Sequence, residues 1–433
     1  MSEYHHTLLD NGLQLVIAPL PHLHSVEIIC YVRVGSGYEQ ADEAGLSHFV
    51  EHMMFRGNAR HEGGPQIEQA FERLGSSVNA ATDCESTSFY ARIHPQSVAA
   101  ALEEFAILLR TPCFQQLETE RAIVLEEAQG DFNEQGDDIC LENQTSRLMW
   151  ENHPLGQPVI GFPETIRNFT LEQVQHWHQR HYVPGNVLIS LAGPVNAQEL
   201  QQVAEQVFGD WLPVELPPPP PLLPTVAAET ALPRFAWVRD ADAQLSVQLA
   251  WRTDGWRSPL SPGLRALRRL LGEGGASRLM RRLREESGLT YHVDATLEEF
   301  PQGGCFSIDF TTDPEKLVTV MATLVDELGR STEVPLPEMV QLSRNVRHNL
   351  EFSRDNVEDL CGRYGWGVFS GALRTLEDEL RLWSTMVPQA VEESARRTLQ
   401  PHRLCFACVG PWRAADQAEV EALLSGSLFS CAM

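Results

Sequence analysis

The sequence has few basic residues for its 433 positions. Lysine and arginine together number 33 against 59 aspartates and glutamates, which gives a formal charge of −26. Proteins that bind nucleic-acid phosphates or an anionic membrane surface need a basic patch, because that attraction is electrostatic. We therefore expect no nucleic acid and no membrane among the partners, and we expect charged partners to be basic.

Long apolar runs are also missing. No stretch of 18 or more apolar residues occurs, so the sequence predicts no membrane-spanning helix. The N-terminal MSEYHHTLLDNG lacks the basic and then apolar segments of a secretory signal. Nine cysteines, an odd number scattered along a chain large enough to fold without disulfides, favour a reducing compartment. We therefore predict a cytoplasmic location.

One pair of cysteines has the CxxC spacing. Cys405 and Cys408 lie in the apolar run HRLCFACVG. A thioredoxin-like motif would open a helix, and a zinc site would need a second pair of ligands. The context favours a buried strand over a redox or zinc site.

A proline-rich segment divides the chain into two halves. Residues 213–225 read PVELPPPPPLLPT, and prolines favour an extended spacer. The predicted organisation is a domain over 1–212, a linker over 213–226 and a second domain over 227–433. The halves end alike, because VLISLAGPVNAQEL and LCFACVGPWRAADQ each read as a strand, a Gly-Pro turn and a helix, 217 residues apart. This repeat indicates a duplicated domain.

The order of predicted elements indicates the fold class. Strands come in adjacent pairs, whereas a doubly wound parallel sheet needs strict alternation of strands and helices. The first half has predicted helices over 45–56, 64–74, 95–109 and 117–151, and the second half has them over 264–271 and 278–287. We expect an α+β fold of two similar tandem domains, each a mostly antiparallel sheet with helices packed on one face.

The segment GLSHFVEHMMFRGN contains His48, Glu51 and His52 in an HxxEH arrangement. On a helix these three side chains fall within an arc of roughly 100°. Two imidazoles one turn apart can chelate one metal ion, and zinc suits imidazole and carboxylate ligands. Glu51 could serve as a metal ligand or as a base. HxxEH is the inverse of the HExxH zinc-protease motif, and in proteins with the inverse motif the glutamate deprotonates the zinc-bound water. The alternative is a helix with two solvent-facing histidines.

A third protein ligand is required, and ETERAIVLEEAQGDF offers candidates. Glu120 and Glu127 are seven residues apart, which is two helical turns, and therefore share a face. Taken alone, these glutamates also fit an ordinary solvated helix face.

Four segments together resemble the pitrilysin/insulysin zinc metallopeptidases, of the short, half-length type related to the mitochondrial processing peptidase. They are HFVEHMMFRGN, LGSSVNAATDCESTSFYARI, ERAIVLEEAQ and LREESGLTYHV. The resemblance implies one zinc ion per chain, with His48, His52 and Glu127 as ligands. It also implies Glu51 as general base and Glu120 as the acid that supports the ligands. Glu126 is the fallback for Glu127.

The resemblance extends to substrate binding. In this family the substrate adds a strand to an exposed sheet edge, and the matching residues here are Ser77, Val78, Asn79 and Ala80. Arg284 and Tyr291 match a pair that closes on the substrate from a domain opposite the zinc site. Close relatives often have Arg-Gly-Leu-x-Tyr, whereas this chain has Ser287 before Gly288 and Leu289.

The implied function is zinc-dependent endopeptidase activity on short or unfolded peptides inside a closed dimer chamber. A homodimer is sufficient, since one chain carries the metal set and the Arg/Tyr pair, and a heterodimer with a related chain is the other arrangement. Two alternatives stay open. One is a non-catalytic scaffold or partner subunit of the same fold, and the other is a dedicated maturation protease for one ribosomally made peptide.

Overall fold

The computed structural model describes residues 3–221 and 233–426, and these fall into two compact units. Among the described residues, unit 1 comprises 3–129, 157–221 and 348–380, and unit 2 comprises 130–156, 233–347 and 381–426. Each unit therefore combines segments from both halves of the chain. The predicted domain boundaries stay a prediction. Residues 213–221 of the predicted linker form no helix or strand, and its residues 222–226 lie outside the described residues.

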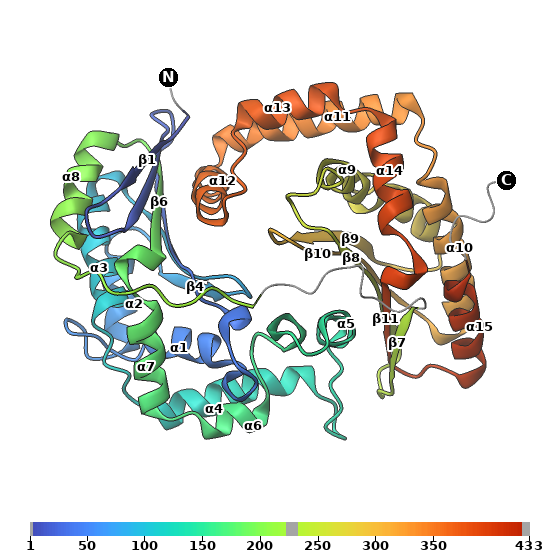
Figure 1. Cartoon of the computed structure of the whole chain (residues 1–433), viewed down its shortest axis with the longest axis horizontal. Coiled ribbons are helices and arrows are strands. Elements are labelled where there is room, and N and C mark those ends of the chain that lie inside the picture. Colours follow the sequence, from blue (N-terminus) through green and yellow to red (C-terminus); the bar gives the residue numbers. More distant parts are fainter. Residues whose placement is uncertain (1–2, 222–232, 427–433) are drawn as a thin grey trace. The chain divides into compact units, whose positions relative to one another are not determined.

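Unit 1 contains a six-stranded sheet with the order β1-β2-β6-β3-β5-β4. Figure 1 labels its strands β1, β6 and β4. All neighbouring strands are antiparallel except β2 and β6. Among the described residues, β4 is an edge strand of this sheet and pairs with β5 alone. The strands are β1 (His5–Leu8), β2 (Gln14–Pro19), β3 (Val26–Val32), β4 (Asn79–Thr82), β5 (Thr87–Ile93) and β6 (Val187–Gly193).

One face of this sheet forms the core of unit 1. Successive side chains of a strand point to opposite faces, and the set containing Ile28, Cys30 and Phe89 is buried against the helices. Burying one such large apolar side chain stabilises the fold by about 1.5–3 kcal/mol. The covering helices are α1 (Leu46–Met54), α2 (Gly64–Glu72), α3 (Val98–Arg110), α4 (Leu117–Ala128), α6 (Pro163–Asn168), α7 (Leu171–His181) and α8 (Ala197–Phe208).

Unit 2 contains a five-stranded sheet with the order β7-β11-β8-β10-β9. Its topology repeats that of β2 to β6 in unit 1. Strand β7 pairs parallel with β11, and β11, β8, β10 and β9 then pair antiparallel in that order. The repeated strand-turn-helix is β6–α8 in unit 1 and β11–α15 (Ala414–Ser425) in unit 2. The prediction of two similar, mostly antiparallel domains is thus confirmed. The strands are β7 (Arg234–Val238), β8 (Leu245–Thr253), β9 (Val293–Glu299), β10 (Gly304–Thr312) and β11 (Leu404–Val409).

In the second half of the chain, pairs of strands are followed by helices, as predicted. Cys405 and Cys408 both lie in β11 and are fully buried, so the prediction of a buried strand is confirmed. Burial also raises the pKa of the Cys408 thiol, which keeps it protonated. The helices are α9 (Ser261–Gly272), a π-helical turn (Met280–Glu285), α10 (Leu317–Arg330), α11 (Leu336–Phe352), α12 (Val357–Ser370), α13 (Leu376–Thr385), α14 (Pro388–Thr398) and α15 (Ala414–Ser425).

Each sheet carries one further helix on the face opposite its core, and that helix comes from the other half of the chain. Helix α12 contacts β2, β3 and β6 of unit 1, where Cys361 Sγ lies 3.3 Å from the Ser190 carbonyl oxygen. Helix α5 (Leu141–Trp150) contacts β7, β8 and β11 of unit 2, where Thr145 donates a hydrogen bond to Gln248. The two halves have therefore exchanged one helix each.

The predicted single helix over 117–151 is wrong. The structure has two helices, α4 and α5, separated by residues 129–140. Gly136 has φ +85°, a left-handed conformation that ends regular helix. The Asn133 side chain accepts hydrogen bonds from the backbone N–H groups of Gln135 and Asp137, which stabilises a turn instead. The break lets α4 belong to unit 1 and α5 to unit 2.

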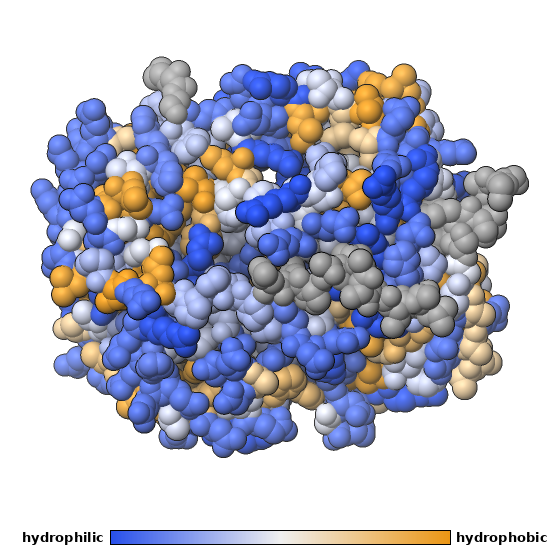
Figure 2. Space-filling view, viewed as in Figure 1, coloured by the Kyte–Doolittle hydropathy of each residue, from blue (hydrophilic) through white to orange (hydrophobic). Residues whose placement is uncertain are grey.

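One face of the molecule is mainly polar. Figure 2 shows a face on which hydrophilic residues predominate and hydrophobic residues gather in scattered groups. Among the described residues, no helix is both long and apolar enough to cross a membrane.

Candidate metal centre

Helix α1 presents the HxxEH residues. Phe49, Val50 and Met53 are fully buried in the core of unit 1, which turns His48 and His52 to the other side of the helix. The two imidazole rings lie with their centroids 4.6 Å apart. The motif thus forms the close pair of imidazoles that its spacing predicts.

The N-terminus of α1 is fixed by a buried carboxylate. Glu39 accepts hydrogen bonds from the backbone N–H groups of Gly45 and Ser47, each at 2.7 Å. Burial raises the pKa of Glu39 to about 7, and the two backbone hydrogen bonds oppose that rise. An acceptor at this end satisfies N–H groups that have no partner within the helix.

Helix α4 brings Glu127 to the same place. Its Oε1 lies 3.7 Å from His48 Nε2, and its Oε2 lies 3.4 Å from His52 Nε2. One ligand atom from each of the three residues lies within 4.8 Å of the other two. Glu126, the fallback, is exposed and is not part of this group. The structure therefore brings together His48, His52 and Glu127.

Glu120 contacts the nitrogen of His52 that does not face Glu127. It is 4% exposed, and its Oε1 accepts a hydrogen bond from His52 Nδ1 at 2.8 Å. Its Oε2 forms an ion pair with Arg56 Nε. Burial alone would raise the pKa of Glu120, but the hydrogen bonds from His52 and Arg56 outweigh burial and hold it below the usual value. With Nδ1 donating to Glu120, His52 keeps Nε2 as the acceptor that faces Glu127.

The protonation of the two histidines differs. Burial, aided by the neighbouring His52, lowers the pKa of His48 to about 4, so its ring is neutral at pH 7. Burial acts in the same direction on His52, but the hydrogen bond and charge of Glu120 raise its pKa overall. Two imidazole nitrogens and a carboxylate oxygen are a donor set that zinc prefers, so these residues fit a zinc ion.

Glu51 lies between the two histidines in sequence and is 8% exposed. Thr82 donates a hydrogen bond to its Oε2, with 2.5 Å between the oxygens. Burial raises the pKa of Glu51, and the Thr82 hydrogen bond partly offsets that rise. A cavity of about 290 Å³ is lined by Glu51, His52 and Arg56. A small group bound there would be next to a carboxylate that can take up a proton.

The predicted substrate-binding residues lie at the sheet edge. Asn79 and Ala80 are the first two residues of the edge strand β4, and Ser77 and Val78 precede it. Val78 is buried, whereas Ser77 and Asn79 are exposed. Thr82, at the other end of the same strand, is the residue that bonds Glu51.

Arg284 and Tyr291 belong to unit 2 and meet each other. The Arg284 guanidinium carbon lies 5.1 Å from the centroid of the Tyr291 ring. Tyr291 is 80% exposed, which makes it one of the most exposed large side chains described. Arg284 also lies 3.4 Å from Glu285. Both side chains are accessible to a ligand.

Three residues at this site were not predicted. Arg56 lies one helical turn after His52, and this spacing would have placed it beside the same partners. Thr82 and Glu39 carry no comparable signal, because their bonds to Glu51 and to the start of α1 depend on tertiary structure.

Comparison with known proteins identifies related sequences and folds. Residues 15–162 match the family model described as insulinase (peptidase family M16), and residues 168–338 match the model described as peptidase M16 inactive domain. His48, His52 and Glu127, called the His48 cluster below, lie in the first segment, as do the residues around them. A Mycobacterium bovis protein named an uncharacterized zinc protease is 30% identical over 411 residues, which cover 94% of this chain and 92% of that protein.

Solved structures share the fold. A protease from Helicobacter pylori aligns with a TM-score of 0.87 at 21% identity, covering 94% of this chain and 99% of the other. A Pseudomonas fluorescens structure described as a peptidase M16 inactive domain aligns with a TM-score of 0.83 at 20% identity, covering 95% and 99%. At these identities the likeness shows the fold alone.

Proposed function

Because this chain belongs to the insulinase family, peptidase family M16, we propose that it is a zinc-dependent endopeptidase that cleaves short or unfolded peptides. The observation that carries the proposal is the meeting of His48, His52 and Glu127 within 4.8 Å beside the buried Glu51. A scaffold protein has no physical need for such a donor set next to a carboxylate of raised pKa.

The three proposed ligands come from two helices, α1 and α4. We propose that they bind one zinc ion per chain through His48 Nε2, His52 Nε2 and a Glu127 carboxylate oxygen. Zinc, when bound, supplies a Lewis acid that polarises the scissile carbonyl and lowers the pKa of water to about 7. Glu120 and Arg56 fix the orientation of His52, which limits the cost of ordering the site.

Glu51 serves as the proton carrier of the reaction. It takes a proton from the attacking water as the water oxygen bonds to the carbonyl carbon, and it gives that proton to the amine nitrogen as the C–N bond breaks. Thr82 donates a hydrogen bond to Glu51 Oε2, so Oε1 is the oxygen that takes up the proton from water. Thr82 is therefore a positioning residue.

The peptide backbone would add to the outer edge of β4, which pairs with no other described strand, at Ser77, Val78, Asn79 and Ala80. Main-chain hydrogen bonds provide affinity in this mode without fixing the sequence, and side-chain pockets provide selection. The short edge strand ends at Thr82, which bonds Glu51, and this supports the role because it places a bound backbone close to Glu51.

We further propose a homodimer that encloses the substrate in a chamber, with Arg284 and Tyr291 of one chain acting at the zinc cluster of the other. The guanidinium and the phenol are suitable donors to a peptide carbonyl and to the oxyanion that develops on it. A closed chamber selects short or unfolded peptides, and the surplus of acidic residues favours basic ones. The predicted cytoplasmic location remains part of this proposal.

Two alternatives remain. A non-catalytic scaffold or partner subunit is favoured by the words "inactive domain" in the second family model and in one solved structure. A dedicated maturation protease, working as a heterodimer with a related chain, fits the same catalytic residues.

A cleavage assay separates the enzyme from the scaffold. The zinc-loaded chain should cleave a library of basic, unfolded peptides, and a chelator should abolish cleavage until zinc is returned. A chain that holds zinc and cleaves no peptide supports the scaffold. Cleavage confined to one member of a broad library supports the maturation protease.

A further inference from the structure

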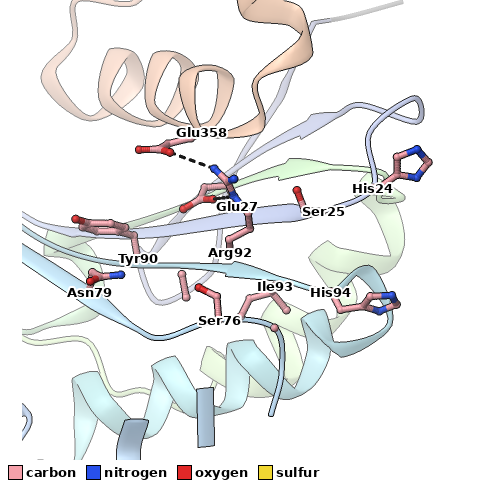
Figure 3. Close-up of a pocket in the computed structure, with 12 residues that line it drawn as sticks. His24, Ser25, Glu27, Ser76, Asn79, Tyr90, Arg92, Ile93, His94 and Glu358 are labelled. Atoms are coloured by element: carbon pink, nitrogen blue, oxygen red, sulfur yellow. Dashed lines mark hydrogen bonds and ion pairs between the residues drawn. The ribbon is translucent and has the colours of Figure 1, made fainter. Parts of the chain in front are cut away.

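Unit 1 contains a second cavity, of about 450 Å³, at the edge of its sheet (Figure 3). It lies between the start of α12 and the strands β4 and β5. Its wall includes Asn79 from the edge strand, Tyr90 and Arg92 from β5, Glu27 from β3 and Glu358 from α12. None of these side chains belongs to the His48 cluster.

The cavity opens on the face of the sheet opposite the core. Asn79 pairs with Tyr90 in the register of β4 and β5, and Arg92 pairs with Glu27 in that of β5 and β3, so these four side chains share one face. The alternate residues Ala91 and Ile93 point into the core. Helix α12 covers this face over β2, β3 and β6, while Tyr90 and Asn79 stay accessible beyond it.

The charged groups of the cavity form one network. Arg92 lies between two carboxylates, 3.3 Å from Glu27 Oε2 and 3.1 Å from Glu358 Oε2 (Figure 3). Glu27 is 4% exposed and Glu358 is 60% exposed, so Glu358 is the carboxylate that a ligand can reach. Two carboxylates against one guanidinium leave an excess negative charge, and the Tyr90 ring adds a flat apolar wall.

The position of the cavity relates it to a strand added at β4. Side chains of an added strand alternate between the two faces, so every second one would lie over the face that bears the cavity. Long side chains also reach diagonal neighbours on the same face. Asn79 precedes Thr82 by three residues, which is about 10 Å along a strand. A side chain in the cavity would thus belong to a residue about three positions from the bond that Glu51 serves.

We propose that this cavity is a binding subsite for a lysine or arginine side chain of a peptide paired with β4, with Glu358 as the residue that selects the positive charge. The aliphatic stem lies along Tyr90, and the charged end pairs with the exposed Glu358 carboxylate. This subsite rests on the proposed peptidase function and deepens it, because it names the side chain that the enzyme selects away from the scissile bond.

The test compares peptides that differ at one position. An unfolded parent peptide receives lysine, glutamine or glutamate at each of its positions in turn. We measure kcat/KM with the zinc-loaded wild-type chain, and Kd by fluorescence anisotropy with a Glu51→Gln chain. Lysine should be favoured over glutamate by about two- to fivefold at one of these positions.

Three variants locate the preference. Glu358→Gln should reduce the lysine-to-glutamate ratio towards one, and Glu358→Lys should invert it. Asp359→Asn makes the same change of charge in the same turn of α12, at an exposed residue outside the cavity wall, and should keep the wild-type ratio. A wild-type ratio of one in both assays, or an equal change in Glu358→Gln and Asp359→Asn, overturns the proposal.

The two readouts separate this inference from the proposed function. If the peptides bind with the lysine preference but the wild-type chain cleaves none of them, the peptidase function fails and the subsite stands. If cleavage occurs with no charge preference at any position, the subsite fails and the peptidase function stands. A chain that binds none of the peptides also overturns the subsite.

Discussion

Thr82 Oγ1 lies 2.5 Å from Glu51 Oε2, so a residue of the edge strand β4 holds the carboxylate that lies beside the histidines of α1. The strand proposed to receive the substrate and the group proposed to move the proton are thus in direct contact. This contact makes the alignment of Glu51 depend on the sheet edge.

Replacing Thr82 with valine removes the hydroxyl and keeps the shape. We expect Thr82→Val to lower kcat by about 10- to 100-fold with KM nearly unchanged, because a hydrogen bond to a charged group contributes about 1.5–3 kcal/mol. Thr82→Ser keeps the hydroxyl and should retain most of kcat. Equal losses in the two variants would mean that the methyl group, and not the hydrogen bond, matters.

The neighbouring glutamates of α4 provide a matched pair for the metal ligand. We expect Glu127→Gln to lose zinc affinity by more than about 100-fold, since removal of a ligand should cost more than removal of a supporting group. Glu126→Gln makes the same change at the exposed neighbouring residue and should keep zinc. Competition against a chromophoric chelator measures both affinities. Loss of zinc from the Glu126 variant alone would transfer the ligand role to Glu126.

Glu120 should act on zinc through His52. Glu120→Gln removes the charge that fixes the His52 ring, and we expect zinc affinity to fall by about 10- to 100-fold. Glu118→Gln is the control, because Glu118 lies in the same first turn of α4 and its side chain is 80% exposed. Competition against the same chelator measures the zinc affinity of both variants. An unchanged zinc affinity in the Glu120 variant would leave Glu120 with a structural role only.

The dimer proposal predicts complementation between chains. A Glu51→Gln chain keeps the Arg/Tyr pair, and an Arg284→Ala chain keeps the catalytic base. Mixed in equal amounts, two inactive preparations should regain up to about a quarter of wild-type activity, because one complete site forms in each mixed dimer. The absence of rescue in a verified mixed dimer would favour a site that uses Arg284 of the same chain, or none.

The sequence predicts those features that depend on local pattern. The alternation of apolar residues and the Gly-Pro turns at Gly193 and Gly410 predict both sheets and their duplication, and the structure confirms them. The spacing of His48 and His52 predicts that their rings meet. Such features arise within one turn of a helix or within one strand, so single-sequence reasoning reaches them.

Contacts between distant segments could not be predicted. The exchange of α5 and α12 between the sheets depends on the whole topology. The network of Glu27, Arg92 and Glu358 joins residues up to 331 positions apart, and no local pattern marks it. The break between α4 and α5 is a different case: Asn133, Gly136 and Asp137 favour a turn, so the sequence carries a local signal that the predicted single helix ignores.

The central claim is that the His48 cluster binds zinc beside a catalytic base, and the Glu51→Gln chain tests it most directly. Zinc content and peptide cleavage are measured on the same preparation, next to the wild-type chain. We expect both chains to hold about one zinc ion, and we expect the variant to lose about 100- to 10,000-fold in kcat. A variant with undiminished turnover, or a wild-type chain that binds no zinc under non-chelating conditions, would contradict the account.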